Sequence, residues 1–339
     1  MKSVFAGVLL TVAAAYGATD PQLVGLMMPD AKMIAGLQVA DSQSTAFGQF
    51  LLKQIPANAG LDNFVAATGF DPRQDLSAVV AASAGDNRWL LAGRGTFQAV
   101  RTAGLAEMAG AIVTRYKGVD LISGNPNNGA PNRVNPNRAN PNRGGGRPNS
   151  AAAAGAAPVN GVAFLDSSTV LIGDLQLIKS AVDRRAGGAV FNGPLAVKAQ
   201  EVSGQNQAWA ATLTPAADLV AGLNGTSTSA GPMANVLQAI TGLSIGVQLG
   251  AANVTLSSEA ATRSNQDAQA LVDVVHFVMG MAQANRKDPQ TGNVAALVDA
   301  ASISASGASV RLTVTVPEQQ LEQLFPPQPG VKKISLPAR

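Results

Sequence analysis

Residues 309–316 read SVRLTVTV and form the clearest strand signal in the chain. Apolar residues alternate with polar ones along this stretch, which is the pattern of a strand with one buried face. Pro317 follows at once, and the residues after it, EQQLEQLF, favour a short helix that begins at this proline. The stretch therefore predicts a strand that leads directly into a helix. The apolar positions of the strand are Val310, Leu312, Val314 and Val316.

The same passage from strand to helix occurs earlier in the chain, at residues 168–182. There Asp174 is predicted to cap a helix that ends at Gly187-Gly188. Strand and helix patterns alternate through the rest of both halves. Further strands are expected at 33–39, 76–83, 89–95, 119–122, 162–165, 208–213, 243–249 and 254–257. Further helices are expected at 42–54 with Ser42 or Ser44 as N-cap, at 61–68, after Thr96, after Thr214-Pro215, at 232–240 and at 264–284.

The order strand, helix, strand, strand, helix, strand hairpin, helix recurs in the two halves, which predicts an internal duplication. The expected fold class is α+β, with two ferredoxin-like βαββα-type repeats whose mainly antiparallel sheets carry helices packed on one face. The first repeat is expected to span residues 30–190 and the second residues 205–325. The residues between 187 and 207 are interpreted as the joint.

The first 17 residues have the features of a secretory signal peptide. Lys2 supplies a positive end, a short uncharged apolar run follows, and Ala15-Tyr16-Gly17 places small residues at −3 and −1 for cleavage after Gly17. The alternative is a buried N-terminal helix. Because no later stretch is apolar for long enough to span a bilayer, we expect an exported protein of the periplasm or extracellular space with no transmembrane anchor after cleavage.

Residues 124–160 form the clearest boundary and carry the repeated unit Pro-Asn-Arg. Such a segment is too poor in apolar surface to fold, so it is expected to be a disordered loop between two strands. Without its four arginines the formal net charge falls from +3 to −1, so the basic character is local. An extended basic tail is expected at 326–339. The candidate anion or partner contacts are Arg133, Arg138, Arg143 and Arg147 in the loop and Lys332 and Lys333 in the tail.

Composition argues against several chemistries. The chain has no cysteine and one histidine, which excludes disulfides, thiolate metal sites and His-pair zinc sites. Aromatic residues make up 4%, which counts against nucleic-acid and sugar binding. Gly93-Arg94-Gly95 resembles a nucleotide-binding turn, but the third glycine is replaced by Gln98. No cofactor or metal is therefore expected.

The favoured function is a non-catalytic exported module that binds or interacts through its surfaces, with an envelope protein or an anionic polymer as the expected partner. No nucleic acid is expected. One alternative is a hydrolase that uses Asp273 and His276 with a serine that the sequence does not identify. The other alternative is a carrier of an apolar ligand, which requires a closed apolar cavity.

The alanine-rich body, the late apolar helix and the ending SVRLTVTV-PEQQLEQLF together resemble a loose group of secreted bacterial proteins of unknown function. These are similar in having duplicated ferredoxin-like units and a closing element of valine-rich strand, proline and short acidic helix. The resemblance covers residues 30–325 in organisation and 302–325 in sequence. It implies the α+β fold and no known activity, cofactor or site residue.

Overall fold

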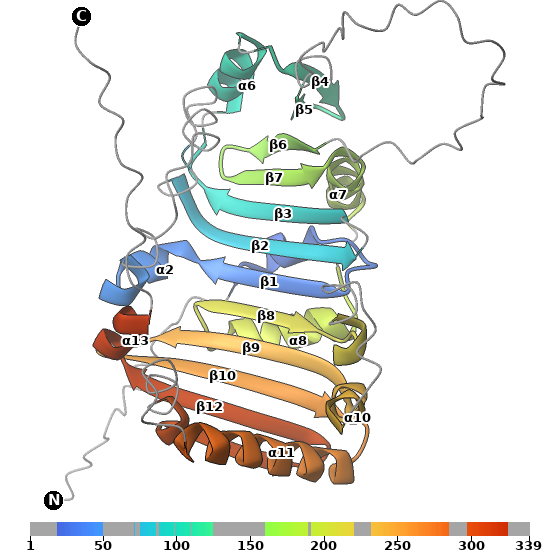
Figure 1. Ribbon diagram of the computed structural model, residues 1–339. Coiled ribbons are helices and arrows are strands. Elements are labelled where there is room, and N and C mark those ends of the chain that lie inside the picture. The colour runs from blue at the N-terminus through green and yellow to red at the C-terminus, as the bar shows by residue number, and fades with distance from the viewer. Residues whose placement is uncertain are drawn as a thin grey trace, which may run out of the picture. The chain divides into compact units, whose positions relative to one another are not determined.

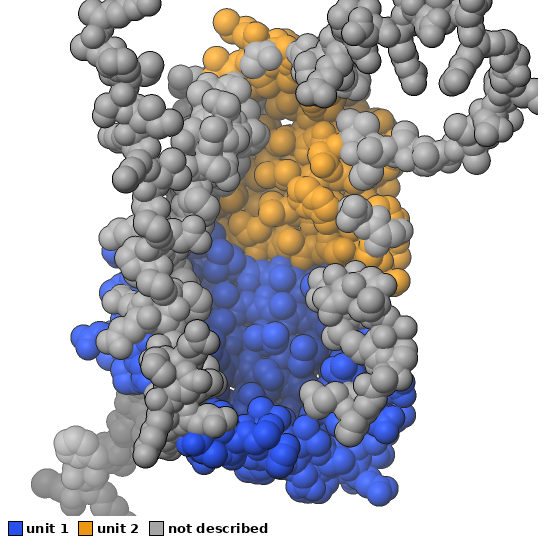
Figure 2. Space-filling view, in the orientation of Figure 1, with its two compact units in different colours: residues 1–21, 33–56, 193–339 blue, residues 22–32, 57–192 orange. Residues whose placement is uncertain are grey.

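The α+β class is confirmed by the computed structural model, which contains a large antiparallel sheet and helices (Figure 1). The structure describes residues 19–49, 71, 75–85, 88–97, 99–108, 110–124, 160–188, 191–219, 232–284 and 297–324. The chain divides into two compact units (Figure 2). Unit 1 comprises residues 1–21, 33–56 and 193–339, and unit 2 comprises residues 22–32 and 57–192.

Unit 1 contains six described strands in the order β11-β12-β10-β9-β8-β1. Every neighbouring pair among them is antiparallel. The first described strand, β1, pairs with β8 and belongs to the same compact unit as the second half of the sequence, not to a unit of residues 30–190. The strands are β1 (Met33–Gln38), β8 (Ala208–Thr212), β9 (Ile240–Leu249), β10 (Asn253–Thr262), β11 (Ala301–Ser306) and β12 (Ser309–Pro317).

Helices cover both faces of this sheet. On one face, Val272 of α11 packs with Ala260 and Val310, and Leu321 of α13 packs with Val254. On the other face, α8 lies over β8, β1 and β9. These unit 1 helices are α2 (Val39–Gln43), α8 (Pro194–Ser203), α10 (Pro232–Ala239), α11 (Asn265–Ala284) and α13 (Glu318–Leu324).

Unit 2 contains six described strands in the order β2-β3-β7-β6-β5-β4, again all antiparallel. Val170 and Leu171 are adjacent in β7, point to opposite faces, and are both fully buried, so both faces of this strand are covered. The elements are α1 (Pro21–Gly25), β2 (Leu76–Gly85), β3 (Arg88–Gly95), α6 (Ala99–Met108), β4 (Ile112–Tyr116), β5 (Val119–Ser123), β6 (Asn160–Asp166), β7 (Thr169–Asp174) and α7 (Leu175–Gly187).

The predicted ends of α7 are confirmed. The Asp174 carboxylate accepts hydrogen bonds from the backbone N–H groups of Gln176 and Leu177, at 2.8 and 3.2 Å. At the other end Gly188 has φ 69°, a left-handed conformation that glycine adopts without steric cost. The C-terminus of α7 is thereby fixed, and its last turn carries Arg184 and Arg185.

The largest difference from the sequence-based expectation is α8, which replaces most of the predicted joint. The sequence feature that indicates the start of this helix is Pro194 directly after Gly193, because proline is favoured in the first turn of a helix. The strands β4 and β11 were also not predicted. The predicted N-caps Ser42 and Ser44 are wrong. Helix α2 already begins at Val39, and Ser42 instead donates to the Gln38 carbonyl.

The prediction that β9 buries only one face is also wrong. Ile245, on the expected buried face, is 45% exposed, whereas Ser244 on the opposite face is 4% exposed. Strand β9 contacts both α8 and α10, so both of its faces are partly covered. The helix predicted at 61–68, the loop segment at 125–159 and the tail from 326 lie outside the described residues. Within the described ranges, no helix is both long and apolar enough to cross a membrane.

Candidate functional site

Unit 2 contains a cavity of about 300 Å³ that is lined by three arginines. Arg94 comes from β3, and Arg184 and Arg185 come from the last turn of α7. Gln22 and Leu26, from the α1 segment, also line this cavity. We call this cavity the arginine pocket.

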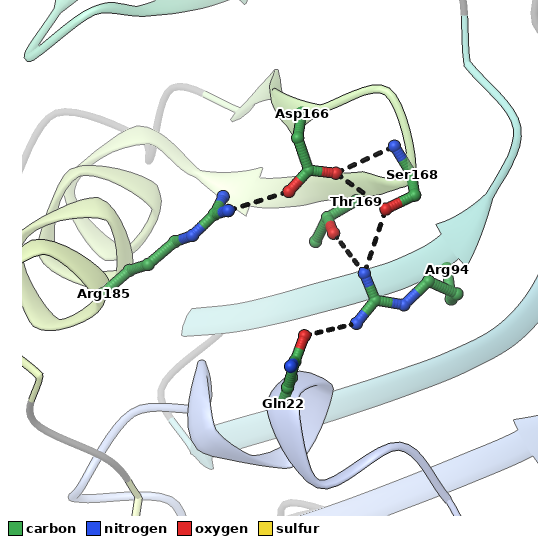
Figure 3. A network of polar contacts seen from close by, with 6 residues as sticks. All are labelled: Gln22, Arg94, Asp166, Ser168, Thr169 and Arg185. Atoms are coloured by element: carbon green, nitrogen blue, oxygen red, sulfur yellow. Dashed lines mark hydrogen bonds and ion pairs between the residues drawn. The ribbon is translucent and has the colours of Figure 1, made fainter.

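Hydrogen bonds from both Nη atoms hold Arg94 in place (Figure 3). Its Nη1 donates to Thr169 Oγ1 at 2.6 Å and to Ser168 Oγ at 3.2 Å. Its Nη2 donates to Gln22 Oε1 at 3.0 Å. The guanidinium is thus fixed between the β6–β7 turn and the α1 segment, which gives the pocket one positive charge in a defined orientation.

Asp166 fixes the second arginine. Arg185 Nη2 lies 2.8 Å from Asp166 Oδ2, while the other carboxylate oxygen accepts from the N–H and the hydroxyl of Ser168, each at 2.8 Å (Figure 3). Burial alone would raise the pKa of Asp166, but hydrogen bonds from Ser168, Thr169 and Arg185 outweigh burial and lower the pKa to about 2. Asp166 is therefore ionised at neutral pH.

Arg184 is the least satisfied of the three arginines. Its Nη2 donates to the Leu26 carbonyl at 2.7 Å, but its Nε is buried and has no hydrogen-bond partner among the described residues. Burial lowers the pKa of the Arg184 guanidinium, while Asp30 and Asp183 act in the opposite direction. A buried donor without an acceptor costs about 1–3 kcal/mol, so this group favours an incoming acceptor.

The arginine pocket brings three guanidinium groups together. One of them, that of Arg185, pairs directly with the carboxylate of Asp166. The two acids that act on Arg184 from outside have other cations as partners: Asp30 pairs with Arg88 at 3.2 Å and Asp183 with Lys117 at 2.6 Å. An anionic group is the ligand that this field attracts.

The site residues expected from the sequence are not those of the pocket. The four loop arginines and the two tail lysines lie outside the described residues: Arg133, Arg138, Arg143, Arg147, Lys332 and Lys333. The predicted hydrolase pair lies on the exposed surface of α11, where Asp273 accepts a hydrogen bond from Gln269 at 3.1 Å. Over the described ranges, His276 makes no hydrogen bond and no three acidic or histidine side chains gather as metal ligands.

In the sequence, Gly93-Arg94-Gly95 resembles a nucleotide-binding turn that lacks its third glycine. The structure shows that Arg94 lines a pocket with its side chain, within a continuous strand. Arg184 and Arg185 could be recognised in the sequence only as two basic residues in the last turn of a capped helix. That position is also common for cations that merely complement the helix dipole.

Comparisons with known proteins show the fold alone. No family model matches the chain, and no curated protein matches it. Among solved structures, a crystal form of the protein TP0453 is similar with a TM-score of 0.52 and 11% sequence identity, over 91% of this chain and 98% of that one. A second crystal form of TP0453 gives a TM-score of 0.50 at 11% identity, over 92% and 99% of the two chains.

Proposed function

We propose that the protein is an exported, non-catalytic binding module whose arginine pocket receives the carboxylate or phosphate group of a small ligand. The observation that carries this proposal is the buried Nε of Arg184, which has no partner among the described residues although two further guanidinium groups line the same cavity. A cavity of about 300 Å³ is at the lower limit of small-molecule sites, which suits a small anion or a charged head group.

The non-catalytic part of the proposal is supported by the residue inventory. The chain has no cysteine, and its single histidine is exposed on α11. Arginine is always charged at physiological pH, so it binds anions well but is a poor proton donor or acceptor. A pocket lined by guanidinium groups, one of which is paired with the ionised carboxylate of Asp166, is suited to binding.

Isothermal titration calorimetry at low ionic strength tests the anion site, with inorganic phosphate and citrate as probes and chloride as the ionic control. We expect saturable binding of phosphate or citrate, and a Kd at least about tenfold weaker in Arg184→Gln and in Arg185→Gln. Absence of binding, or an unchanged Kd in both variants, would refute the proposal.

Arg115→Gln is the matched control, because Arg115 lies in the same unit and is 73% exposed in its side chain. Its loss removes the same charge without touching the pocket, so its Kd for phosphate is expected to stay within about twofold of the parent protein. If Arg115→Gln weakens binding as much as Arg184→Gln does, the attraction is a general charge effect and the pocket is not the site.

Export is part of the same proposal, with residues 1–17 removed as a signal peptide. It is supported by the position of Thr19, which is 5% exposed and accepts a hydrogen bond from Trp209 Nε1 at 2.8 Å. The folded part thus includes residues just after the expected cleavage point. Mass spectrometry of the secreted or periplasmic protein is expected to give a mature chain that begins at Ala18.

We also propose that the chain contains two copies of one α+β unit, the ferredoxin-like repeat expected from the sequence. The strand order β2-β3-β7-β6 in unit 2 matches β9-β10-β12-β11 in unit 1, and a helix follows β3 and β10 in each case. Equivalent backbone hydrogen bonds support this proposal. The N–H of Gly95 donates to the Ser168 carbonyl at 3.0 Å, and the N–H of Thr262 donates to the Ala308 carbonyl at 2.8 Å. An experimental structure in which these two sets of strands fail to superpose would refute the duplication.

A further inference from the structure

Unit 1 contains a second cavity, of about 530 Å³, on the sheet face that α8 only partly covers. Three neighbouring strands supply its floor in register: Ser257 of β10 lies opposite Gly246 of β9 and Thr313 of β12. Gln248 and Thr255 extend the floor, and Asn206, just after α8, lies at its wall. We call this cavity the polar groove.

Several polar side-chain atoms in the polar groove have no hydrogen-bond partner among the described residues and remain accessible from the groove. Ser244 is 4% exposed, lines the groove, and its hydroxyl makes no hydrogen bond within the described part of the chain. The side chains of Gln248 and Thr313 likewise form none among the described residues. Asn206, which is 8% exposed, donates through Nδ2 to the Val202 carbonyl at 2.7 Å, which leaves its Oδ1 as an acceptor. Accessible donors and acceptors that have no protein partner can pair with a ligand in the groove.

A glycine holds one of these groups in place. A Cβ on Gly246 would collide with the side-chain amide of Asn206, so the absence of a side chain on β9 lets that amide lie directly over the strand. The amide is thus fixed from below by the strand and from the side by the Val202 carbonyl. Pre-positioned amides of this kind lower the entropic cost of binding a hydrogen-bonding ligand.

The charges of the polar groove are balanced, which distinguishes it from the arginine pocket. Glu259 Oε1 lies 2.9 Å from Lys198 Nζ, and Glu259 Oε2 lies 2.8 Å from Arg311 Nη2. Glu201 also pairs with Lys198, at 3.2 Å. Because the carboxylates and cations neutralise each other, the groove attracts neither anions nor cations strongly.

We propose that the polar groove binds an uncharged polyhydroxylated ligand, of the chemical class of oligosaccharides. Hydroxyl and amide groups lie on the floor and wall, so a ligand with donors and acceptors on every face satisfies them, whereas an apolar ligand does not. None of the described residues that line the groove is aromatic, so these residues offer no ring for stacking. The low aromatic content of the chain counts against tight sugar binding, so we expect a weak, millimolar Kd.

Saturation-transfer NMR with maltotriose as the probe tests this proposal on the full chain. We expect a saturable signal with a Kd of about 1–10 mM, weakened at least about fivefold in Ser244→Ala and Gln248→Ala. Gln269→Ala, which removes the same amide from the exposed surface of α11 in the same unit, is the control and is expected to bind as the parent protein does. Gly246→Ala is expected to weaken binding by displacing Asn206.

Three outcomes would overturn the proposal: no saturable signal, an equal signal in the groove variants and the control, or tighter binding of a tri-serine peptide than of maltotriose. If Ser244→Ala lowers the melting temperature, Gln248→Ala decides the question, because Gln248 is only half-buried and makes no hydrogen bond among the described residues. Phosphate is expected not to compete with maltotriose, since the groove has balanced charges.

Discussion

Gly36→Ala is expected to destabilise the protein by about 2–4 kcal/mol. Gly36 of β1 lies directly opposite Trp209 of β8, and a Cβ at this position would lie 2.6 Å from three atoms of the indole ring. Real Cβ atoms are not found this close to other heavy atoms, so the ring must move. Trp209 is 4% exposed, which leaves it little room to do so.

The magnitude follows from two contributions. Forcing an extra methyl group into a packed interior costs about 1–3 kcal/mol. Moving the indole also weakens the 2.8 Å hydrogen bond from Trp209 Nε1 to Thr19 Oγ1, whose net contribution is about 1 kcal/mol. The sum is a large fraction of the total stability of an ordinary domain.

Urea unfolding followed by tryptophan fluorescence measures this cost. The chain has two tryptophans, so a Trp89→Phe background leaves Trp209 as the only reporter. Gly280→Ala is the control, because Gly280 lies in α11 with no atom within 4 Å of an added Cβ. It is expected to stabilise by up to about 1 kcal/mol through helix propensity. A Gly36→Ala cost below about 0.5 kcal/mol would refute the reasoning.

Three further predictions concern stability. Burial alone would raise the pKa of Glu259, but hydrogen bonds from Arg311 and Lys198 outweigh burial and lower it to about 2. The contribution of Glu259 to the free energy of unfolding is therefore fully present above its unfolded pKa and is lost as pH falls from about 4.5 towards 2. Glu259→Gln is therefore expected to cost about 1–2 kcal/mol near neutral pH and nothing near pH 2, and an equal loss in urea unfolding at both pH values would contradict this. Because Ser123 and Gly161 are register partners, a short Gly-Ser linker in place of residues 126–158 is expected to leave the melting temperature unchanged, and a large drop would show that the segment is needed for folding. Asp174→Ala removes the cap of α7 and is expected to cost about 1 kcal/mol in chemical unfolding, whereas Asp174→Ser is expected to retain most of it.

The sequence predicted those helices and strands whose formation depends on residues close together in the chain. Asp174 and Gly188 mark the two ends of α7 because capping depends on residues within one turn of the helix end. The alternation at residues 309–316 predicted β12 for the same reason. In contrast, α8 has few large apolar residues, and its buried face is formed mainly by small ones, so its periodicity is weak.

Neither proposed binding site could be assembled from the sequence, because both depend on contacts between distant residues. Arg94 and Thr169 are 75 positions apart and meet only because β3 pairs with β7. Arg184 and Leu26 are 158 positions apart. In the polar groove, the alternation along β9 predicts that Ser244 lies on the solvent side of an amphipathic strand, whereas the structure buries this residue on the face that α8 partly covers.

The pairing of β1 with β8 has a consequence for biosynthesis. Residues 33–38 leave the ribosome long before residues 208–212, and until then the early strand has no β8 edge against which to pair. An unpaired strand edge is a template for association with other chains. A chain that terminates prematurely before residue 208 is therefore expected to aggregate, so that this protein depends on its own completion for solubility.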